Sequence, residues 1–185
     1  MGVRRRGREY ALQMLYAMDM TGYQPDEVFA GFNAIQDLNR DAFYYARRLV
    51  DGVHGHLESI DEALVRFAEH WKLHRMAAVD RNLLRLGIYE LMFLTEIPFP
   101  IIINEALEII KEFSDAEGTQ FVNGILDAAS REYRPDEAGP RKTPRKPVLA
   151  AASLPEAVSV AEVVSAPEVD SEVEVSLEVA PEPGA

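Results

Sequence analysis

Residues 76–94 read MAAVDRNLLRLGIYELMFL and make the longest and most apolar helical pattern in the chain. Their apolar side chains recur at spacings of three and four, which is the period of an α-helix. Since these side chains cover more than one face, we expect the helix to be central or to keep one side for a partner. Gly87 inside a helix costs about 1 kcal/mol relative to alanine, and we expect close packing against a second helix to explain it.

Apolar residues keep the helical period on both sides of this segment. Before it, the pattern predicts four helices: from Glu9 to Asp19, from Pro25, from near Asp41 to Gly55, and from about Ser59. After it come two more, one with Pro100 as its first residue and one opened by Ser114 and Glu117, which resemble a capping box. Hairpin signals are missing from this region. The expected fold is therefore all-α, with seven helices.

Composition divides the chain near Arg134. All 16 aromatic residues precede this point, and 8 of the 11 prolines follow it. A segment rich in proline, glutamate and valine and without aromatic residues cannot bury enough apolar surface to offset its ordering entropy. We therefore expect one helical domain over residues 1–134 and a disordered, acidic tail over residues 135–185.

Arginine is concentrated at the start of a chain whose net charge is −12. Arg4, Arg5, Arg6 and Arg8 occur in the first eight residues, where no acidic residue accompanies them. This concentration predicts a polyanionic partner, with nucleic acid as the first candidate. Because residues 1–135 carry 15 basic and 21 acidic residues, the binding must come from this local patch. The alternative is a disordered basic leader without a partner.

Several other classes of protein are excluded by what the sequence lacks. Without cysteine there are no disulfides, thiolate zinc sites or cysteine nucleophiles. No run of about 18 apolar residues occurs, and the basic start lacks the apolar core of a signal peptide. We expect a cytoplasmic protein with no membrane partner.

Motifs of catalysis and cofactor binding are also missing from the sequence. It contains no glycine-rich phosphate loop, no nucleophile elbow and no dinucleotide fingerprint. His70 and His74 are four residues apart, a spacing that can place two imidazoles on one metal. However, Trp71 stands where the zinc-protease motif has its glutamate. We expect no catalytic residue, no cofactor and no metal, and hence a protein that is not an enzyme.

Three separated blocks closely resemble the NusB family of bacterial transcription antitermination factors in their order and spacing. They are RRRGREYALQMLY (4–16), DRNLLRLGIYEL (80–91), and a region containing IP (97–98), INEA (103–106) and FVNGILD (121–127). The resemblance covers residues 4 to about 134, and its last block is the most specific. It implies a seven-helix fold built from two packed helical sub-bundles.

The resemblance also implies a function and its partners. Members of this family pair with the tenth small-subunit ribosomal protein, called NusE, and the pair binds the single-stranded boxA element of nascent RNA. With RNA polymerase and other Nus factors, they suppress termination during ribosomal RNA transcription. Arginines that contact phosphates and aromatic rings that stack on unpaired bases suit such a partner.

The positions that match the family's functional residues form two groups. The residues expected to contact or frame RNA are Arg4, Arg5, Arg6, Arg8, Tyr16, Arg85, Glu117, Gln120 and Phe121. Asp80 and Arg81 match an acidic–basic pair near the ribosomal-protein interface. Purely structural alternatives exist, because Tyr16 and Phe121 also lie on apolar stripes and Glu117 suits a helix cap.

Two other functions and a role for the tail remain open at this point. The chain is also compatible with a helical protein-interaction module, or with the RNA-binding domain found in NusB-like RNA methyltransferases. The tail lies outside the resemblance, and eight acidic residues and no basic ones follow from Glu156 onward. It is expected either to act as a solubilising segment or to fold back on the arginines and compete with RNA.

Overall fold

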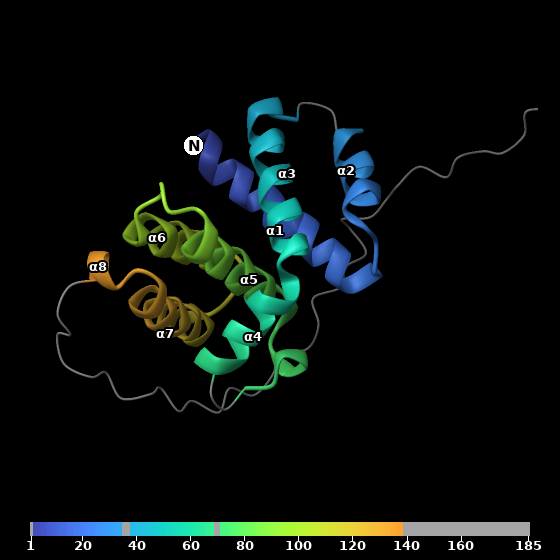
Figure 1. The fold of residues 1–185 in the computed structure, drawn as a ribbon. Coiled ribbons are helices and arrows are strands. Elements are labelled where there is room, and N and C mark those ends of the chain that lie inside the picture. Colours follow the sequence, from blue (N-terminus) through green and yellow to red (C-terminus); the bar gives the residue numbers. More distant parts are fainter. Residues whose placement is uncertain (1, 35–37, 69–70, 139–185) are drawn as a thin grey trace, which may run out of the picture. The chain divides into compact units, whose positions relative to one another are not determined.

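The computed structural model describes residues 2–34, 38–68 and 71–138, and every regular element in these ranges is helical (Figure 1). The helices are α1 (Val3–Thr21), α2 (Pro25–Asn33), α3 (Arg40–Gly55), α4 (Leu57–Phe67), α5 (Ala78–Phe93), α6 (Phe99–Ile110), α7 (Ala116–Tyr133) and α8 (Pro135–Ala138), with a 3₁₀ helix, η1 (Leu73–Arg75), before α5. The all-α prediction is confirmed. The seven predicted helices are α1 to α7, and α8 adds a single turn.

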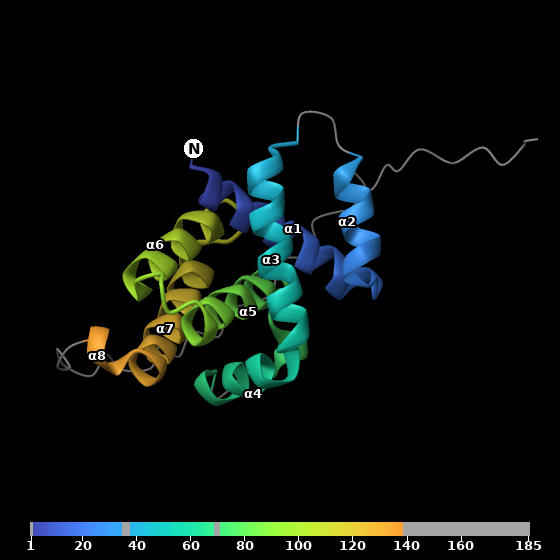
Figure 2. The same ribbon diagram turned by 45° about the horizontal axis from the view of Figure 1, so that its top comes forward.

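The helices form two sub-bundles that share α5. Helices α1, α2 and α3 pack on one another, and α4, α6 and α7 pack around α5. Helix α5 also contacts α1 and α3, so it joins the two groups (Figure 2). The predicted arrangement of two packed sub-bundles is confirmed.

A continuous cluster of buried apolar side chains runs through both sub-bundles and centres on α5. Leu84, Ile88 and Leu91 of this helix are fully buried. Gly87 lies where α5 meets α7, and a Cβ atom at this position would lie 2.8 Å from Cδ2 of Leu126. Of the two alternatives expected for this helix, the central position is the one observed, and the prediction that Gly87 permits close packing is confirmed. The expectation that it is the longest helix is wrong, since α5 has 16 residues and α1 has 19.

Two predicted helix starts are wrong. Helix α1 begins at Val3 and not at Glu9, so the four arginines belong to its first two turns. Arginine is a good helix former, and two of the four arginines pair with neighbouring helices. Helix α7 is capped by Asp115, whose carboxylate accepts from Gly118 N at 2.8 Å, in place of the expected Ser114. Both residue types make good N-caps, and this chain uses the later one.

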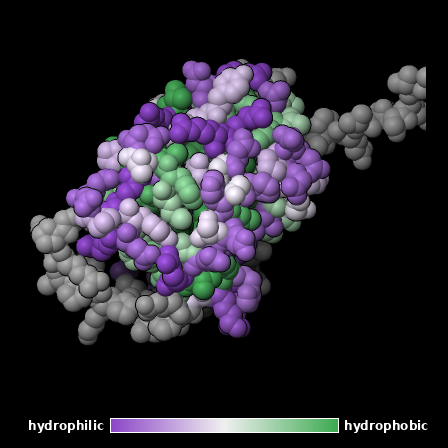
Figure 3. Space-filling view, in the orientation of Figure 1, coloured by the Kyte–Doolittle hydropathy of each residue, from purple (hydrophilic) through white to green (hydrophobic). Residues whose placement is uncertain are grey.

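Some sequence predictions concern residues outside the described ranges. The tail is described only as far as Ala138, and His70 of the His70–His74 pair also falls outside. Among the helices that are described, none combines the length and hydrophobicity needed to cross a lipid bilayer. On the face shown in Figure 3, hydrophilic residues surround smaller hydrophobic areas.

Candidate nucleic-acid interface

The first two turns of α1 carry Arg4, Arg5, Arg6 and Arg8, which we call the arginine end. This part of α1 lies beside α6 (Figure 1) and packs closely on α3. A Cβ atom at Gly7 would lie 2.6 Å from the Tyr45 ring, so glycine is required for this close approach. The packing fixes the direction in which each of the four arginines leaves the helix.

Arg8 is buried and makes a bidentate ion pair with Glu90 of α5. Its Nη2 donates to Oε1 at 2.7 Å and its Nε to Oε2 at 2.9 Å. Only 2% of Arg8 and 1% of Glu90 are exposed. The predicted contact between Arg8 and RNA stays a prediction, and it would require this pair to open.

The hydroxyl group of Tyr45 on α3 completes the buried pair. It donates to Oε1 of Glu90 at 3.3 Å, and its ring lies beside the Arg8 guanidinium. Burial and the adjacent Glu90 carboxylate raise the pKa of Tyr45 to about 12. Three helices are therefore held together around one buried charge pair.

Arg5 lies at the boundary between core and solvent. Its Nε and Nη2 donate to the two carboxylate oxygens of Glu105 on α6, at 3.0 and 2.8 Å. The hydrogen bond from Arg5 is the main cause that lowers the pKa of Glu105. With 32% of its side chain exposed, Arg5 is paired and still reaches the surface.

Arg4 and Arg6 are exposed. Within the described ranges, neither forms an ion pair or a side-chain hydrogen bond. The guanidinium groups of these two residues are therefore available to an outside anion. The arginine end thus contains one buried, one partly exposed and two exposed cations.

A second charged group lies at the other end of α1, and we call it the acid–base network. It consists of Asp19, Asp61, Arg81, Asn82 and Arg85, which come from α1, α4 and α5. Arg85 pairs with both carboxylate oxygens of Asp61, at 2.7 and 2.8 Å, and reaches Asp19 at 3.3 Å. Arg81 pairs with Asp19 and also donates to the backbone carbonyl groups of Leu73 and Met76.

Asp19 is the centre of this network. Burial alone would raise the pKa of its carboxyl group, but the hydrogen bonds from Arg81 and Asn82 and the charge of Arg85 outweigh burial and lower it. The sequence analysis missed Asp19, Asp61 and Asn82. The spacing of Arg81 and Arg85, four apart on one helix face, was the signal that their partners lie on a neighbouring helix.

Asp80 and Arg81 do not pair with each other. Asp80 is buried, while Arg81 pairs with Asp19. Burial is the main cause that raises the pKa of Asp80, and the nearby Asp115 adds to it. The assignment of Asp80 and Arg81 to a partner interface stays a prediction.

The remaining predicted residues lie on α1 and α7. Glu117 and Gln120 are exposed in the first turns of α7, and Tyr16 of α1 is half-buried. Phe121 is half-buried too, with its ring centre 5.4 Å from that of Trp71. Phe121 therefore has an apolar partner inside the protein as well as a partly accessible ring.

The predicted site residues are thus distributed over the arginine end, the region of the acid–base network and the first turns of α7. A rise of about 1.5 Å per residue separates Arg4 from Asp19 by roughly 22 Å along α1. The arginine end lies beside α5 and α6, and the acid–base network joins α1 to α4 and α5. Among the described residues, no group of three or more histidines, cysteines or carboxylates is arranged to hold a metal ion.

This chain is similar to known proteins of the NusB family. The NusB family model matches residues 5–131. The transcription antitermination protein NusB of Myxococcus xanthus is 44% identical over 131 residues, which cover 69% of this chain and 94% of that protein. The residues matched by the family model contain both the arginine end, apart from Arg4, and the acid–base network.

Solved structures give the same result. A NusB structure from T. maritima has a TM-score of 0.66 and 34% identity, covering 73% of this chain and 95% of that one. A chain from the crystal structure of the antitermination factors NusB and NusE in complex with dsRNA has a TM-score of 0.63 and 32% identity. In that case, 72% of this chain and 99% of the other are covered.

Proposed function

The chain belongs to the NusB family of transcription antitermination proteins, and from this we propose that it binds single-stranded boxA RNA jointly with the ribosomal protein NusE. The bound pair joins RNA polymerase and other Nus factors in the cytoplasm and suppresses termination, notably in ribosomal RNA transcription. Family membership confirms the expectation that the protein is not an enzyme.

The observation that carries this proposal is the exposure of Arg4 and Arg6 on a helix whose other arginines are paired. A domain with more acidic than basic residues repels RNA on average, so a local group of available cations must supply the attraction. Arginines that neutralise phosphates release the cations condensed on the RNA, which gives an affinity that depends on salt. The solved complex of a similar chain with NusE and RNA supports the same choice of partners.

The sequence of boxA must be read by contacts other than those to phosphate. Arginine–phosphate pairs position a strand without selecting its bases. Tyr16 and Phe121 are half-buried aromatic residues with accessible surface, and Gln120 offers an exposed amide. Together with Arg85 and Glu117, they are the residues that we propose to contact or frame bases.

NusE is proposed to bind where Asp80 and Arg81 lie, at the start of α5. The acid–base network holds this start of α5 against the end of α1 and against α4. A surface that is fixed before binding loses less conformational entropy when a partner docks. In this proposal, Arg81 holds the start of α5 in place and so keeps the surrounding surface in the conformation that NusE binds.

The test is a titration with fluorescent boxA RNA and a scrambled RNA of equal length, each with and without purified NusE. We expect the chain to prefer boxA over the scrambled sequence and NusE to increase this preference. The variant Arg66→Ala removes an exposed α4 arginine that pairs with Glu132 and serves as a control for charge loss. Equal affinity for the two RNAs in both conditions would refute the proposed recognition of boxA.

A further inference from the structure

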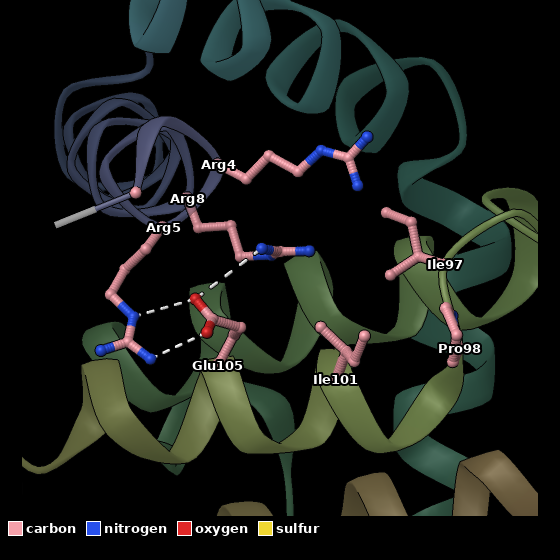
Figure 4. Close-up of a pocket in the computed structure, with 8 residues that line it drawn as sticks. Arg4, Arg5, Arg8, Ile97, Pro98, Ile101 and Glu105 are labelled. Carbon is pink, nitrogen blue, oxygen red and sulfur yellow. Dashed lines mark hydrogen bonds and ion pairs between the residues drawn. The ribbon is translucent and has the colours of Figure 1, made fainter.

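A groove with a volume of about 300 Å³ lies between the start of α1 and the first turns of α6 (Figure 4). Its lining residues are Gly2, Arg4, Arg5, Arg8, Ile97, Pro98, Ile101 and Glu105. We call it the α1–α6 groove. Its volume is at the lower end of the range for small-molecule sites, about 300–1,000 Å³, so it suits one small group and not a helix.

The two sides of the α1–α6 groove differ in chemistry. Arginines of α1 form one side, and Figure 4 shows the Arg4 side chain extending across the opening. The other side is apolar and consists of Ile97, Pro98 and Ile101. Ile101 is 50% exposed, so a large part of its side chain is accessible to a ligand in the groove.

Ion pairs and hydrogen bonds hold both sides of the groove in place. On the arginine side, Arg5 pairs with Glu105 and Arg8 with Glu90. On the apolar side, the buried Arg134 donates to the carbonyl groups of Leu91 and Thr95, at 2.7 and 3.2 Å. These bonds fix the turn that carries Ile97 and Pro98.

The start of α6 is fixed as well. Glu137 of α8 accepts a hydrogen bond from the backbone N–H of Phe99 at 3.1 Å and also pairs with Arg134. Both sides of the groove therefore exist before any ligand arrives, which reduces the entropy lost on binding.

The combination of the two sides identifies the ligand. A phosphate alone needs cations and gains nothing from an apolar surface, whereas an apolar peptide gains nothing from three arginines. A nucleotide has both a planar, largely apolar base and an anionic phosphate. Arginine planes stack on bases, and unstacked bases are the parts of single-stranded RNA that proteins take into pockets.

The charges in the groove suit a single phosphate. Glu105 and Glu90 each pair with an arginine, while Arg4 has no carboxylate partner in the described part of the chain. One positive charge is therefore left over. We propose that the α1–α6 groove receives one unstacked base of the bound RNA, which lies against Ile101 and Pro98 while Arg4 contacts the adjoining phosphate. This inference rests on the proposed RNA-binding function.

The first test compares the full-length variants Ile101→Ala and Val65→Ala by RNA titration in the presence of NusE. Val65 of α4 is 51% exposed, so it is a matched control outside the groove. Because Ile101→Ala removes an apolar contact and no charge, we expect the affinity to fall about fivefold with an unchanged salt slope. Arg4→Ala is expected instead to reduce the salt slope, since it removes a phosphate contact.

The second test locates the base by removing bases from the RNA one at a time. At one abasic position, Ile101→Ala is expected to have no further effect, because the base and its apolar wall act as one contact. At all other positions, the effect of Ile101→Ala should remain about fivefold.

Three results would overturn the inference. The first is that Ile101→Ala and Val65→Ala bind RNA with equal affinity. The second is that Ile101→Ala lowers the affinity by the same factor at every abasic position. The third is that Ile101→Ala binds NusE more weakly than the wild type when no RNA is present. The last would assign the groove to a protein partner. Failure of the proposed function is a separate result, namely wild-type protein that binds RNA without preferring boxA. Circular dichroism should give the same helical content for all variants, since the replaced side chains are half exposed.

Discussion

The charged groups at the two ends of α1 contain the same kinds of side chain but differ in how many of the arginines are paired. At the arginine end, two of four arginines pair with glutamates, and Arg4 and Arg6 lie exposed without such partners in the described ranges. In the acid–base network, Arg81 and Arg85 both pair with aspartates. We therefore propose that a surplus of cations over nearby carboxylates, and not arginine as such, marks the surface that attracts a polyanion.

Depth separates the two regions further. The Arg8–Glu90 pair is nearly inaccessible, while 12 to 25% of the Arg85 and Asp61 side chains remains exposed. A buried charge depends on its partner, because water does not replace the lost interaction. The stability of the domain should therefore be more sensitive to changes behind the arginine end than to changes in the acid–base network.

The largest effect on stability is expected for Glu90→Gln. This change leaves the buried guanidinium of Arg8 without its main partner and should lower the free energy of unfolding by about 3 kcal/mol. Urea denaturation followed by circular dichroism measures it. Replacing both partners together, as Arg8→Met with Glu90→Leu, should restore most of the stability. If the free energy of unfolding of Glu90→Gln lies within about 0.5 kcal/mol of the wild-type value, the Arg8–Glu90 pair is not essential for stability.

A smaller effect is expected for Arg85→Ala in the acid–base network. It removes a bidentate pair with Asp61, but Asp19 keeps Arg81 and water reaches the site, so we expect a loss of about 1–2 kcal/mol. Arg66→Ala, which removes an exposed pair with Glu132, should change stability by less than about 0.5 kcal/mol. Equal losses of stability in Arg85→Ala and Arg66→Ala would show that an ion pair in the acid–base network contributes no more to stability than an exposed one. A lower RNA affinity of the folded Arg85→Ala variant would confirm the expected RNA contact.

The arginine end should also lose stability at alkaline pH through Tyr45. The pKa of its hydroxyl group rises from 10.0 to about 12 in the folded protein, so the unfolded chain releases this proton first as pH increases. The contribution of Tyr45 is complete below pH 10 and decreases between pH 10 and 12. Unfolding measured across this range should show the decrease, and Tyr45→Phe should make it shallower. An identical decrease in Tyr45→Phe would contradict the assignment.

The sequence predicted local structure better than it predicted pairing. The helical period is a pattern among residues close in sequence, and it also indicated that α5 could be central. Gly87, inside this strongly apolar segment, indicated close packing against another helix. The pairs Arg8–Glu90 and Arg5–Glu105 join residues 82 and 100 positions apart, which no local pattern connects. One signal was present, since a glutamate in a helix that is expected to be central requires a buried cation.

The candidate RNA-binding site was likewise predictable only where it depends on local sequence. Charge alone located the arginine end, but it did not distinguish Arg8, which is buried, from Arg4, which is exposed. That distinction depends on which face of α1 packs against α5 and α6. The apolar side of the α1–α6 groove likewise depends on the turn before α6, which Arg134 fixes from 39 residues further along the chain.

The proposal that Arg4 and Arg6 contact RNA phosphates is tested most directly by the salt dependence of boxA binding in the double variant Arg4→Ala/Arg6→Ala. Losing two phosphate contacts should reduce the slope of log affinity against log salt by about 1.4 for a single strand. The free energy of unfolding should change by less than about 0.5 kcal/mol, because both side chains are exposed. If Arg4 and Arg6 hold RNA, the salt slope should be reduced and the stability unchanged. A slope equal to that of the wild type would contradict this proposal, since the two exposed arginines would then take no part in holding RNA.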